Sequence, residues 1–258
     1  MQFDGIFLHL RRITQTRALP ALFLFCTVFL FIYFFWNVSL TSNSLDDVCA
    51  LFPNKWTQKR LHRTVSLLQA VTVTLEKHKL PYSLMAGALL GVKRHGQFIP
   101  WDDDVDLFVA PRYDETMKKA LRQQQRLCFE NFWGGVKIYF CKDAIGTRMR
   151  PVYPFVDIFT ISPSTCLVPL RCPLYWYGHL KHFESTLYSP TVHTKLYNIS
   201  LRVPRDTNIA LRATFGASWS KTCASPMYDH VRGRSVPNAN IRVNCRVLKY
   251  LCGTPLVV

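Results

Sequence analysis

Acidic residues are scarce in this chain of 258 residues, which has 16 Asp and Glu against 32 Lys and Arg and a formal net charge of +16. A basic balance of this size first suggests a nucleic-acid partner. The sequence shows no basic helix and no aromatic RNP-like motif, so we expect no nucleic acid. Anionic nucleotides, phosphorylated glycans or lipid surfaces are the partners that the charge favours instead.

The sequence also lacks any Cys-x-x-Cys pair and any internal repeat. Because this pair is missing, we expect the nine cysteines to be disulfides or free thiols rather than ligands of a structural zinc ion. Eight of the nine follow Cys26, an even number that suits an oxidising compartment. Cys166 and Cys172 lie close together between prolines and are candidates for closing a small loop, but the connectivity stays open.

Charge is absent from residues 18–36, which are rich in Leu, Phe, Ile and Val. About 19 apolar residues can cross a bilayer core of roughly 30 Å, whereas a signal-peptide core has about 7–15. Arginines precede the segment and aspartates follow it, so the positive-inside rule predicts a type II signal anchor with residues 1–17 in the cytosol. A cleaved signal peptide is the alternative. We expect a lumenal stem at 37–54 and a globular domain at 55–258, in the Golgi or ER. The tripeptide Asn198-Ile199-Ser200 is a glycosylation acceptor sequence, which agrees with a lumenal location.

Apolar periodicity predicts alternating helices and strands across the globular part, with short helices and loops in the proline-rich remainder. Strands that alternate with helices predict an α/β or α+β fold with a mixed sheet flanked by helices. The expected elements are a helix at 55–79, a strand at 82–85, a turn at 87–91 that opens a helix, a strand at 104–109, a helix at about 113–127, and strands at 136–140 and 154–159.

Four of the few acidic residues fall within five positions, 102–106. Asp104 and Asp106 lead into an apolar run, which predicts a buried strand with both side chains on one face. Two carboxylates that are so close repel each other unless a cation lies between them. Mg²⁺ or Mn²⁺ would suit these oxygen ligands, because such an ion takes its remaining ligands from water and substrate phosphates. The alternative is a solvated acidic turn.

Asp157 is the third acidic candidate because it lies in a strand-like run, 155–159, whose alternation would turn it toward a neighbouring strand. Three carboxylates on adjacent strands are typical of metal-dependent nucleotidyl or phosphoryl transfer, in which one carboxylate can also take a proton from the attacking hydroxyl. A buried or capping aspartate is the alternative for Asp157.

The run from Tyr82 to Val109 contains Gly-x-Leu-Leu-Gly, Arg-His and Ile-Pro-Trp-Asp-x-Asp-x-Asp, and it resembles the signature of the LicD family. That family includes bacterial phosphocholine transferases and the animal fukutin and fukutin-related proteins. The similarity continues at Val156-Asp157-Ile158-Phe159 and at Val203-Pro204, followed by Phe215-Gly216-x-x-Trp219. It covers roughly residues 80–220, the core of the LicD-like catalytic domain expected at 55–258.

The resemblance implies a nucleotidyltransferase-like fold and transfer of a phospho-alcohol, such as phosphocholine or ribitol phosphate, from a CDP-linked donor to a glycan or glycoprotein, with Mg²⁺ or Mn²⁺ as cofactor. By position it assigns Asp104, Asp106 and Asp157 to catalysis and the metal. The residues that it assigns to substrate binding are Gly87, Gly91, Arg94, His95 and Asp102.

Among these residues, Arg94 would bind phosphate as a bidentate clamp. Gly87 and Gly91 would allow backbone N–H groups to approach the phosphate, although a helix-start turn without a ligand is the alternative. We expect Trp101 and Trp219 to pack in the core rather than stack on a base.

The chain departs from the family at Ala86-Gly87-Ala88, where relatives commonly have Gly-Gly-Ser or Gly-Gly-Thr. The missing hydroxyl at Ala88 removes one possible phosphate hydrogen bond. The last thirty residues match no pattern. Two other functions therefore stay open: a non-catalytic lumenal protein that binds glycans or partner transferases, and an Asp-x-Asp glycosyltransferase that uses a UDP-sugar.

Overall fold

The computed structural model of the chain describes residues 47–132, 134–145, 152–160, 190–237 and 239–257. The chain divides into two units, residues 1–50 and 51–258, and all the elements below belong to the second. Among the described residues no helix is both long and apolar enough to cross a membrane. The predicted anchor at 18–36 and the predicted Cys166–Cys172 loop lie outside the described residues.

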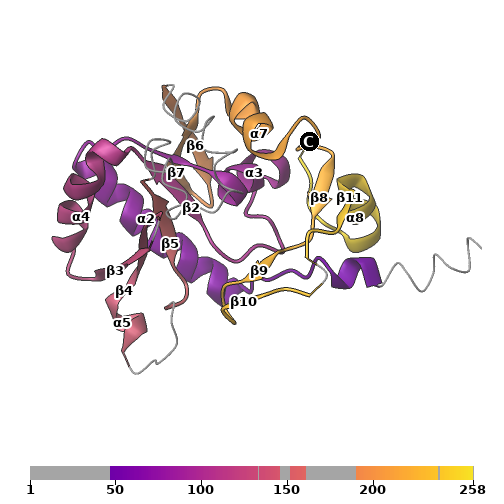
Figure 1. Cartoon of the computed structure of the whole chain (residues 1–258), viewed down its shortest axis with the longest axis horizontal. Coiled ribbons are helices and arrows are strands. Elements are labelled where there is room, and N and C mark those ends of the chain that lie inside the picture. Colours follow the sequence, from indigo (N-terminus) through magenta and orange to yellow (C-terminus); the bar gives the residue numbers. More distant parts are fainter. Residues whose placement is uncertain (1–46, 133, 146–151, 161–189, 238, 258) are drawn as a thin grey trace, which may run out of the picture. The chain divides into compact units, whose positions relative to one another are not determined.

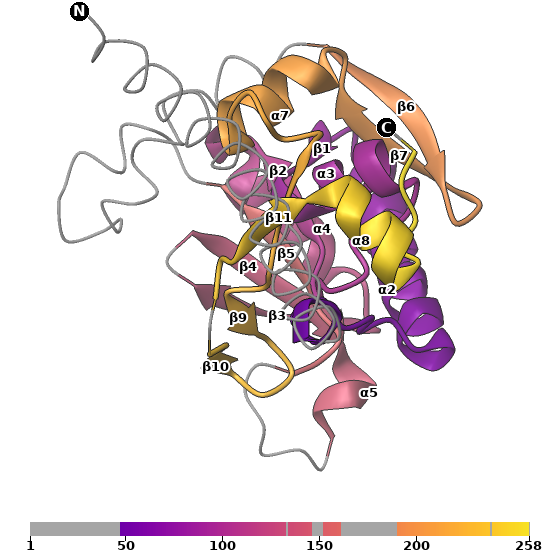
Figure 2. The same ribbon diagram turned by 90° about the vertical axis from the view of Figure 1, so that its right-hand side faces the viewer.

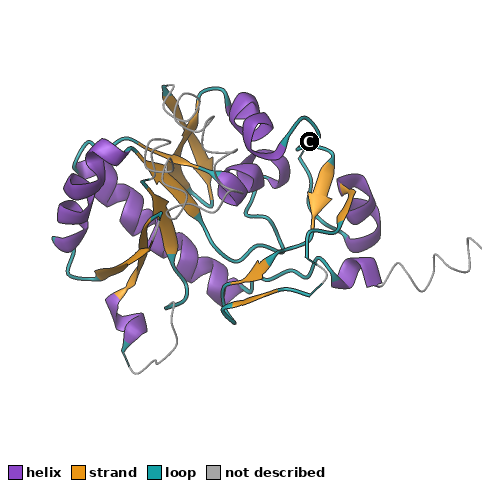
Figure 3. Cartoon of the chain, viewed as in Figure 1, coloured by secondary structure: helices purple, strands orange, loops and turns teal. Residues whose placement is uncertain are grey.

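A five-stranded mixed sheet forms the centre of the fold (Figures 1 and 3). Its strand order is β1-β2-β5-β4-β3, in which β2 and β5 are parallel and all other neighbours are antiparallel. Most residues of the middle strands β2, β4 and β5 are buried and apolar, so these strands form the centre of the core. The strands are β1 (Tyr82–Leu84), β2 (Asp106–Val109), β3 (Leu127–Phe132), β4 (Gly135–Phe140) and β5 (Val156–Phe159).

Helices pack on this sheet, and the longest of them is α2 (Gln58–Lys77). Its N-cap residue Thr57 accepts a hydrogen bond from the Arg60 backbone N–H, which satisfies one of the free donors at the helix start. Its buried side contacts β4 and β5, and the helix lies along the sheet in Figure 1. The remaining helices before residue 160 are α3 (Ala86–His95), the 3₁₀ turn η1 (Pro111–Tyr113), α4 (Asp114–Arg122) and α5 (Cys141–Ala144).

The chain after residue 190 adds a hairpin and a set of small elements (Figure 2). Tyr197 and Asn198 both have positive φ, the conformation of a two-residue hairpin turn that matches strand twist. A disulfide between Cys223 and Cys245 joins two of the later elements. The elements are β6 (Thr191–Leu196), β7 (Ile199–Pro204), α7 (Thr207–Phe215), β8 (Thr222–Ala224), β9 (Tyr228–Asp229), β10 (Arg234–Ser235), β11 (Arg242–Asn244) and α8 (Cys245–Cys252).

The predicted mixed sheet with helices is confirmed, and so are the first helix and the strands at 82–85, 136–140 and 154–159. Three boundaries were wrong. The glycines at 87 and 91 lie inside α3, which already begins at Ala86; β2 begins at Asp106, so Asp104 precedes the strand; and the helix expected at 113–127 ends at Arg122.

Two strand regions were missed. β3 begins at Leu127 and pairs with β4. The stretch 191–204, predicted as part of a region of short helices and loops, forms the β6–β7 hairpin. In both cases strand pairing with a neighbour decided the local structure, which a reading of local periodicity does not detect.

Candidate metal centre

Three charged side chains form a row across the middle of the sheet. Asp106 on β2 is paired in register with Asp157 on β5, and Asp157 is paired in register with Lys137 on β4. Directly opposed residues on neighbouring strands share a face. The Lys137 ammonium donates to both oxygens of Asp157, at 2.6 and 2.8 Å, and lies 3.3 Å above the ring of Phe155.

Asp104 joins this row from the segment just before β2. Carboxylate oxygens of Asp104, Asp106 and Asp157 all lie within 4.8 Å of one another. The structure therefore brings together the three residues predicted to be catalytic, although they come from a loop and two strands rather than from strands alone.

The electrostatics of these carboxylates show that negative charge is crowded here. Burial raises the pKa of Asp106 well above its usual range, and the neighbouring Asp104 and Asp157 raise it further. Burial likewise raises the pKa of Asp157 to about 6, against the opposing effect of Lys137. The pKa of Asp102 is raised by burial and by Asp104 and Asp103.

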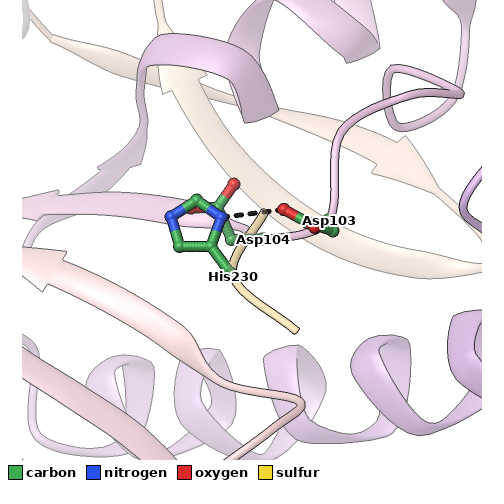
Figure 4. A group of neighbouring side chains, drawn as sticks. All are labelled: Asp103, Asp104 and His230. Carbon is green, nitrogen blue, oxygen red and sulfur yellow. Dashed lines mark hydrogen bonds and ion pairs between the residues drawn. The ribbon is translucent and has the colours of Figure 1, made fainter. Parts of the chain in front are cut away.

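Asp103 has a different environment, which is drawn in Figure 4. One of its oxygens accepts from Lys55 at 2.8 Å and the other lies 2.7 Å from Nδ1 of His230. These partners outweigh the effect of burial and hold the pKa of Asp103 below its usual value. The same imidazole reaches Asp104, with 3.2 Å between Nε2 and Oδ2.

We refer to Asp102, Asp103, Asp104, Asp106 and Asp157 as the acidic cluster. Its five carboxylates face Lys55, Lys137 and His230, so within the described residues named here its negative charge exceeds its positive charge. Oxygen donors that are crowded together with raised pKa values are stabilised by a divalent cation. The donor set fits Mg²⁺ or Mn²⁺, with Asp104, Asp106 and Asp157 as the residues that would hold the ion.

The two glycines of the signature make room for the chain itself. A Cβ on Gly91 would lie 2.7 Å from the Gln97 carbonyl oxygen and 2.9 Å from the Ile99 backbone nitrogen. A Cβ on Gly87 would lie 2.4 Å from a carboxylate oxygen of Asp102. Both glycines therefore let the loop that follows α3 pack against the helix, a role that was not predicted from the sequence. The Asp102 carboxylate lies beside Gly87, at the start of α3.

The basic and aromatic residues of the signature are turned toward the C-terminal segment, residues 216–257. Arg94 is 2 % exposed, and its guanidinium donates to the carbonyl oxygens of Trp219 and Thr222, at 3.0 and 2.9 Å. Trp101 is buried, as expected, and its indole N–H donates to the Ala224 carbonyl at 2.9 Å. These contacts favour an anchoring role for Arg94 over the predicted phosphate clamp.

His95 is part of the same anchor. Its Nδ1 lies 2.6 Å from the Pro255 carbonyl oxygen, and its Nε2 accepts from Nε of Arg94 at 2.9 Å. Burial, together with the Arg94 charge, lowers the pKa of His95 to about 4, so the ring is neutral and Nδ1 carries the proton. In this structure, His95 binds protein groups on both ring nitrogens.

The site includes four residues that were not predicted from the sequence: Lys55, Asp103, Lys137 and His230. Lys137 left a readable signal, because it interrupts an otherwise apolar strand at the position that alternation turns toward one face. No sequence pattern pointed to His230, because it lies 127 residues from Asp103 along the chain, in the part that matched no pattern.

Comparison with known proteins identifies the region that contains this site. Residues 79–206 match the family described as LicD/FKTN/FKRP, nucleotidyltransferase domain. The chain belongs to the LicD family. The matched region of this LicD protein includes α3, the loop that follows it, β2 and β5, and hence every carboxylate of the acidic cluster.

Curated relatives are similar over shorter stretches of this LicD-family chain. The lipopolysaccharide cholinephosphotransferase LicD of Haemophilus influenzae is 42 % identical over 106 residues, which cover 37 % of this chain and 40 % of that protein. The ribitol 5-phosphate transferases FKRP of Mus musculus and Homo sapiens are each 40 % identical over 63 residues, 24 % of this chain and 13 % of theirs. The chain thus spans less than half of the length of these relatives.

Among solved structures, an antigenic nucleotidyltransferase-like protein from Paracoccidioides brasiliensis aligns with 58 % of this chain and 64 % of that one. The identity is 13 % and the TM-score is 0.35.

Proposed function

We propose that this protein transfers a phospho-alcohol, of the phosphocholine or ribitol phosphate kind, from a CDP-linked donor to a hydroxyl of a glycan. The observation that carries the proposal is the meeting of Asp104, Asp106 and Asp157 within 4.8 Å, inside the region that matches the LicD family. The printed activities of the relatives, cholinephosphotransferase and ribitol 5-phosphate transferase, support the choice of a phospho-alcohol.

In the proposed reaction an oxygen of the acceptor hydroxyl attacks the phosphorus that bears the alcohol, a new P–O bond forms, and the bond to CMP breaks. We assign to Asp157, a member of the same group of carboxylates, the proton that the hydroxyl loses. Lys137 orients Asp157 through two hydrogen bonds and brings a positive charge to the same row. A divalent cation held by Asp104, Asp106 and Asp157 would neutralise the charge of the donor phosphates.

Thermal stabilisation of the full chain by nucleotides tests the proposal. CDP-choline, CDP-ribitol, CDP-glycerol and UDP-sugars are each added with and without Mn²⁺. We expect one CDP-alcohol to raise the melting temperature in a metal-dependent way, and we expect Asp104→Asn to lose that shift because a ligand that binds only the folded state stabilises it.

Two other results would redirect the proposal. A shift with UDP-sugars alone would indicate an Asp-x-Asp glycosyltransferase. A well-folded sample that responds to none of the nucleotides would indicate a non-catalytic binding protein.

We further propose that the domain lies in the lumen of the Golgi or ER, held by an anchor at residues 18–36. Two features support this address: the disulfides Cys128–Cys141 and Cys223–Cys245, and the exposed position of Asn198 in the tight turn between β6 and β7. Expression in a secretory cell followed by glycosidase treatment tests it. We expect a mobility shift that Asn198→Gln removes, and the absence of any glycan at this accessible tripeptide would count against the address.

A further inference from the structure

His230 reaches the acidic cluster from outside the part of the chain that matches the LicD family. It directly follows β9, in the C-terminal segment, whereas the family match ends at residue 206. Figure 4 shows its imidazole beside Asp103 and Asp104, and its two ring nitrogens lie 2.7 and 3.2 Å from their carboxylate oxygens. The cluster of this protein therefore contains a nitrogen donor that the matched region alone does not supply.

The orientation of the imidazole is fixed by its surroundings. The ring makes edge contacts with Phe155 and Tyr228, with centroids 5.6 and 5.0 Å away. Nδ1 lies 2.7 Å from Oδ1 of Asp103, whose side chain is 1 % exposed and whose other oxygen is held by Lys55. Asp103 is thus occupied on both oxygens and positions the ring, so that Nε2 faces Asp104.

This pattern is the one that metal-binding histidines use. Such a histidine commonly donates one ring N–H to a carboxylate, which fixes the tautomer and leaves the other nitrogen as the ligand. Here Asp103 is the carboxylate at Nδ1, and Nε2 lies 3.2 Å from Oδ2 of Asp104. Adjacent ligands on an octahedral ion with bonds of about 2.1 Å are about 3 Å apart, so the separation suits two ligands of one cation.

Asp104 is the link between this pair and the rest of the cluster. Two groups of side chains are close enough to hold an ion, Asp103, Asp104 and His230 on one side and Asp104, Asp106 and Asp157 on the other, and they share Asp104. A carboxylate shared by neighbouring groups of ligands is a suitable bridge in sites that hold two ions about 3.5–4 Å apart.

We propose that Nε2 of His230 and Asp104 bind a second divalent cation, that Asp103 positions the imidazole, and that this ion is Mn²⁺ in preference to Mg²⁺. The preference follows from the ligand, because imidazole suits transition metals whereas Mg²⁺ takes oxygen ligands almost alone. The inference rests on the proposed function only in taking Asp104, Asp106 and Asp157 as the first ion site. If so, the C-terminal segment contributes a metal ligand, His230, to the site.

Binding of Mn²⁺ to the full chain, without nucleotide, tests the proposal. Free Mn²⁺ is counted by electron paramagnetic resonance, and pulsed measurements on the bound ion detect coupling to ¹⁴N. We expect two ions per chain and a nitrogen coupling. In His230→Gln we expect the coupling to vanish and the second ion to bind about 10- to 100-fold more weakly.

Three further variants separate the possible readings. His193→Gln changes an exposed histidine on β6 and should leave both the count and the coupling unchanged. Asp103→Asn should weaken the second ion but keep the coupling, because Asp103 positions the ring and does not itself bind the ion. Asp106→Asn should remove the first ion and keep the nitrogen-coupled one.

Some results would overturn the proposal. Absence of nitrogen coupling in the unmodified chain would show that His230 is only an ion-pair partner of the carboxylates, a measurement that requires no variant to fold. Coupling that persists in His230→Gln, or complete loss of Mn²⁺ in Asp106→Asn, would also contradict it. Failure of every CDP-alcohol to bind while the coupling behaves as described would reject the proposed function and keep this inference.

Discussion

The two halves of the signature segment, residues 87–106, have different surroundings. In the acidic half, Asp104 and Asp106 lie together with Asp157 and carry crowded negative charge. In the other half, Arg94 and His95 are buried and bonded to protein carbonyls of the C-terminal segment. One short motif therefore serves both as a candidate metal centre and as an anchor for a distant part of the chain.

The difference shows that residues of one family motif can contact distant parts of the same chain, while the predicted contact of Arg94 and His95 with substrate stays a prediction. The anchor also has a consequence for the site, because the segment that Arg94, His95 and Trp101 hold is the one that carries His230. Substitutions in the two halves should thus have different effects: loss of chemistry in one and loss of stability in the other.

The largest effect should come from the acidic half. We expect Asp106→Asn to lower transferase activity by at least about 100-fold, since it removes one of the charges that would hold metal and phosphate. The melting temperature should stay the same or rise, because the pKa of Asp106 is raised by burial and by its neighbours, so the charge is costly in the folded state. Activity assays and thermal unfolding measure the two effects, with the exposed Glu115→Gln as a control. Unchanged turnover in Asp106→Asn would reject the proposed site.

Arg94→Met should show the opposite pattern. It leaves the carbonyls of Trp219 and Thr222 without their donor, and each buried unsatisfied group costs about 1–3 kcal/mol, so we expect a loss of about 3 kcal/mol in the free energy of unfolding. Urea denaturation measures this loss. If Arg94 were mainly a phosphate clamp, nucleotide affinity would fall instead while stability stayed close to that of the unmodified chain.

His95 should make the stability of the anchor depend on pH. Its pKa is lowered to about 4 in the folded chain, against about 6.5 when unfolded, so the unfolded state alone gains a proton as the pH falls between these values. The free energy of unfolding should therefore decrease from pH 6.5 to pH 4, by up to about 3 kcal/mol from this group. Denaturation at several pH values should give a shallower slope for His95→Gln, and an equal slope in both proteins would show that His95 is not the cause.

The smallest effect should come from the first residue of α3. Ala86 has a φ of +44°, a conformation that costs a residue with a Cβ about 1–2 kcal/mol, whereas glycine adopts it readily. We expect Ala86→Gly to stabilise the protein by about 0.5–1 kcal/mol, the strain relief being partly offset by the entropy of glycine. Ala88→Gly, at a helical position of the same helix, is the matched control and should destabilise. A loss of stability in Ala86→Gly would contradict the strain argument.

Much of the site could be predicted because its main members are close in sequence or lie in strands. Alternation along 155–159 correctly turned Asp157 toward the carboxylate of the neighbouring strand, and the register of β2 and β5 confirms it. The protein contacts of Arg94, Gly87 and Gly91 could not be predicted in the same way. A buried guanidinium and a close backbone approach have the same sequence pattern whether the partner is a phosphate or another part of the chain.

By itself, the sequence determined the mixed α/β class, the acidic segment that leads into a buried strand, and the membership of the LicD family, because these depend on local periodicity and on motifs of contiguous residues. Only the tertiary structure decided that Lys137 neutralises Asp157 and that His230 lies between Asp103 and Asp104. Such contacts depend on strand register and on how the C-terminal segment folds back on α3. Neither is encoded in the spacing of neighbouring residues, since both are set by the packing of elements that lie far apart along the chain.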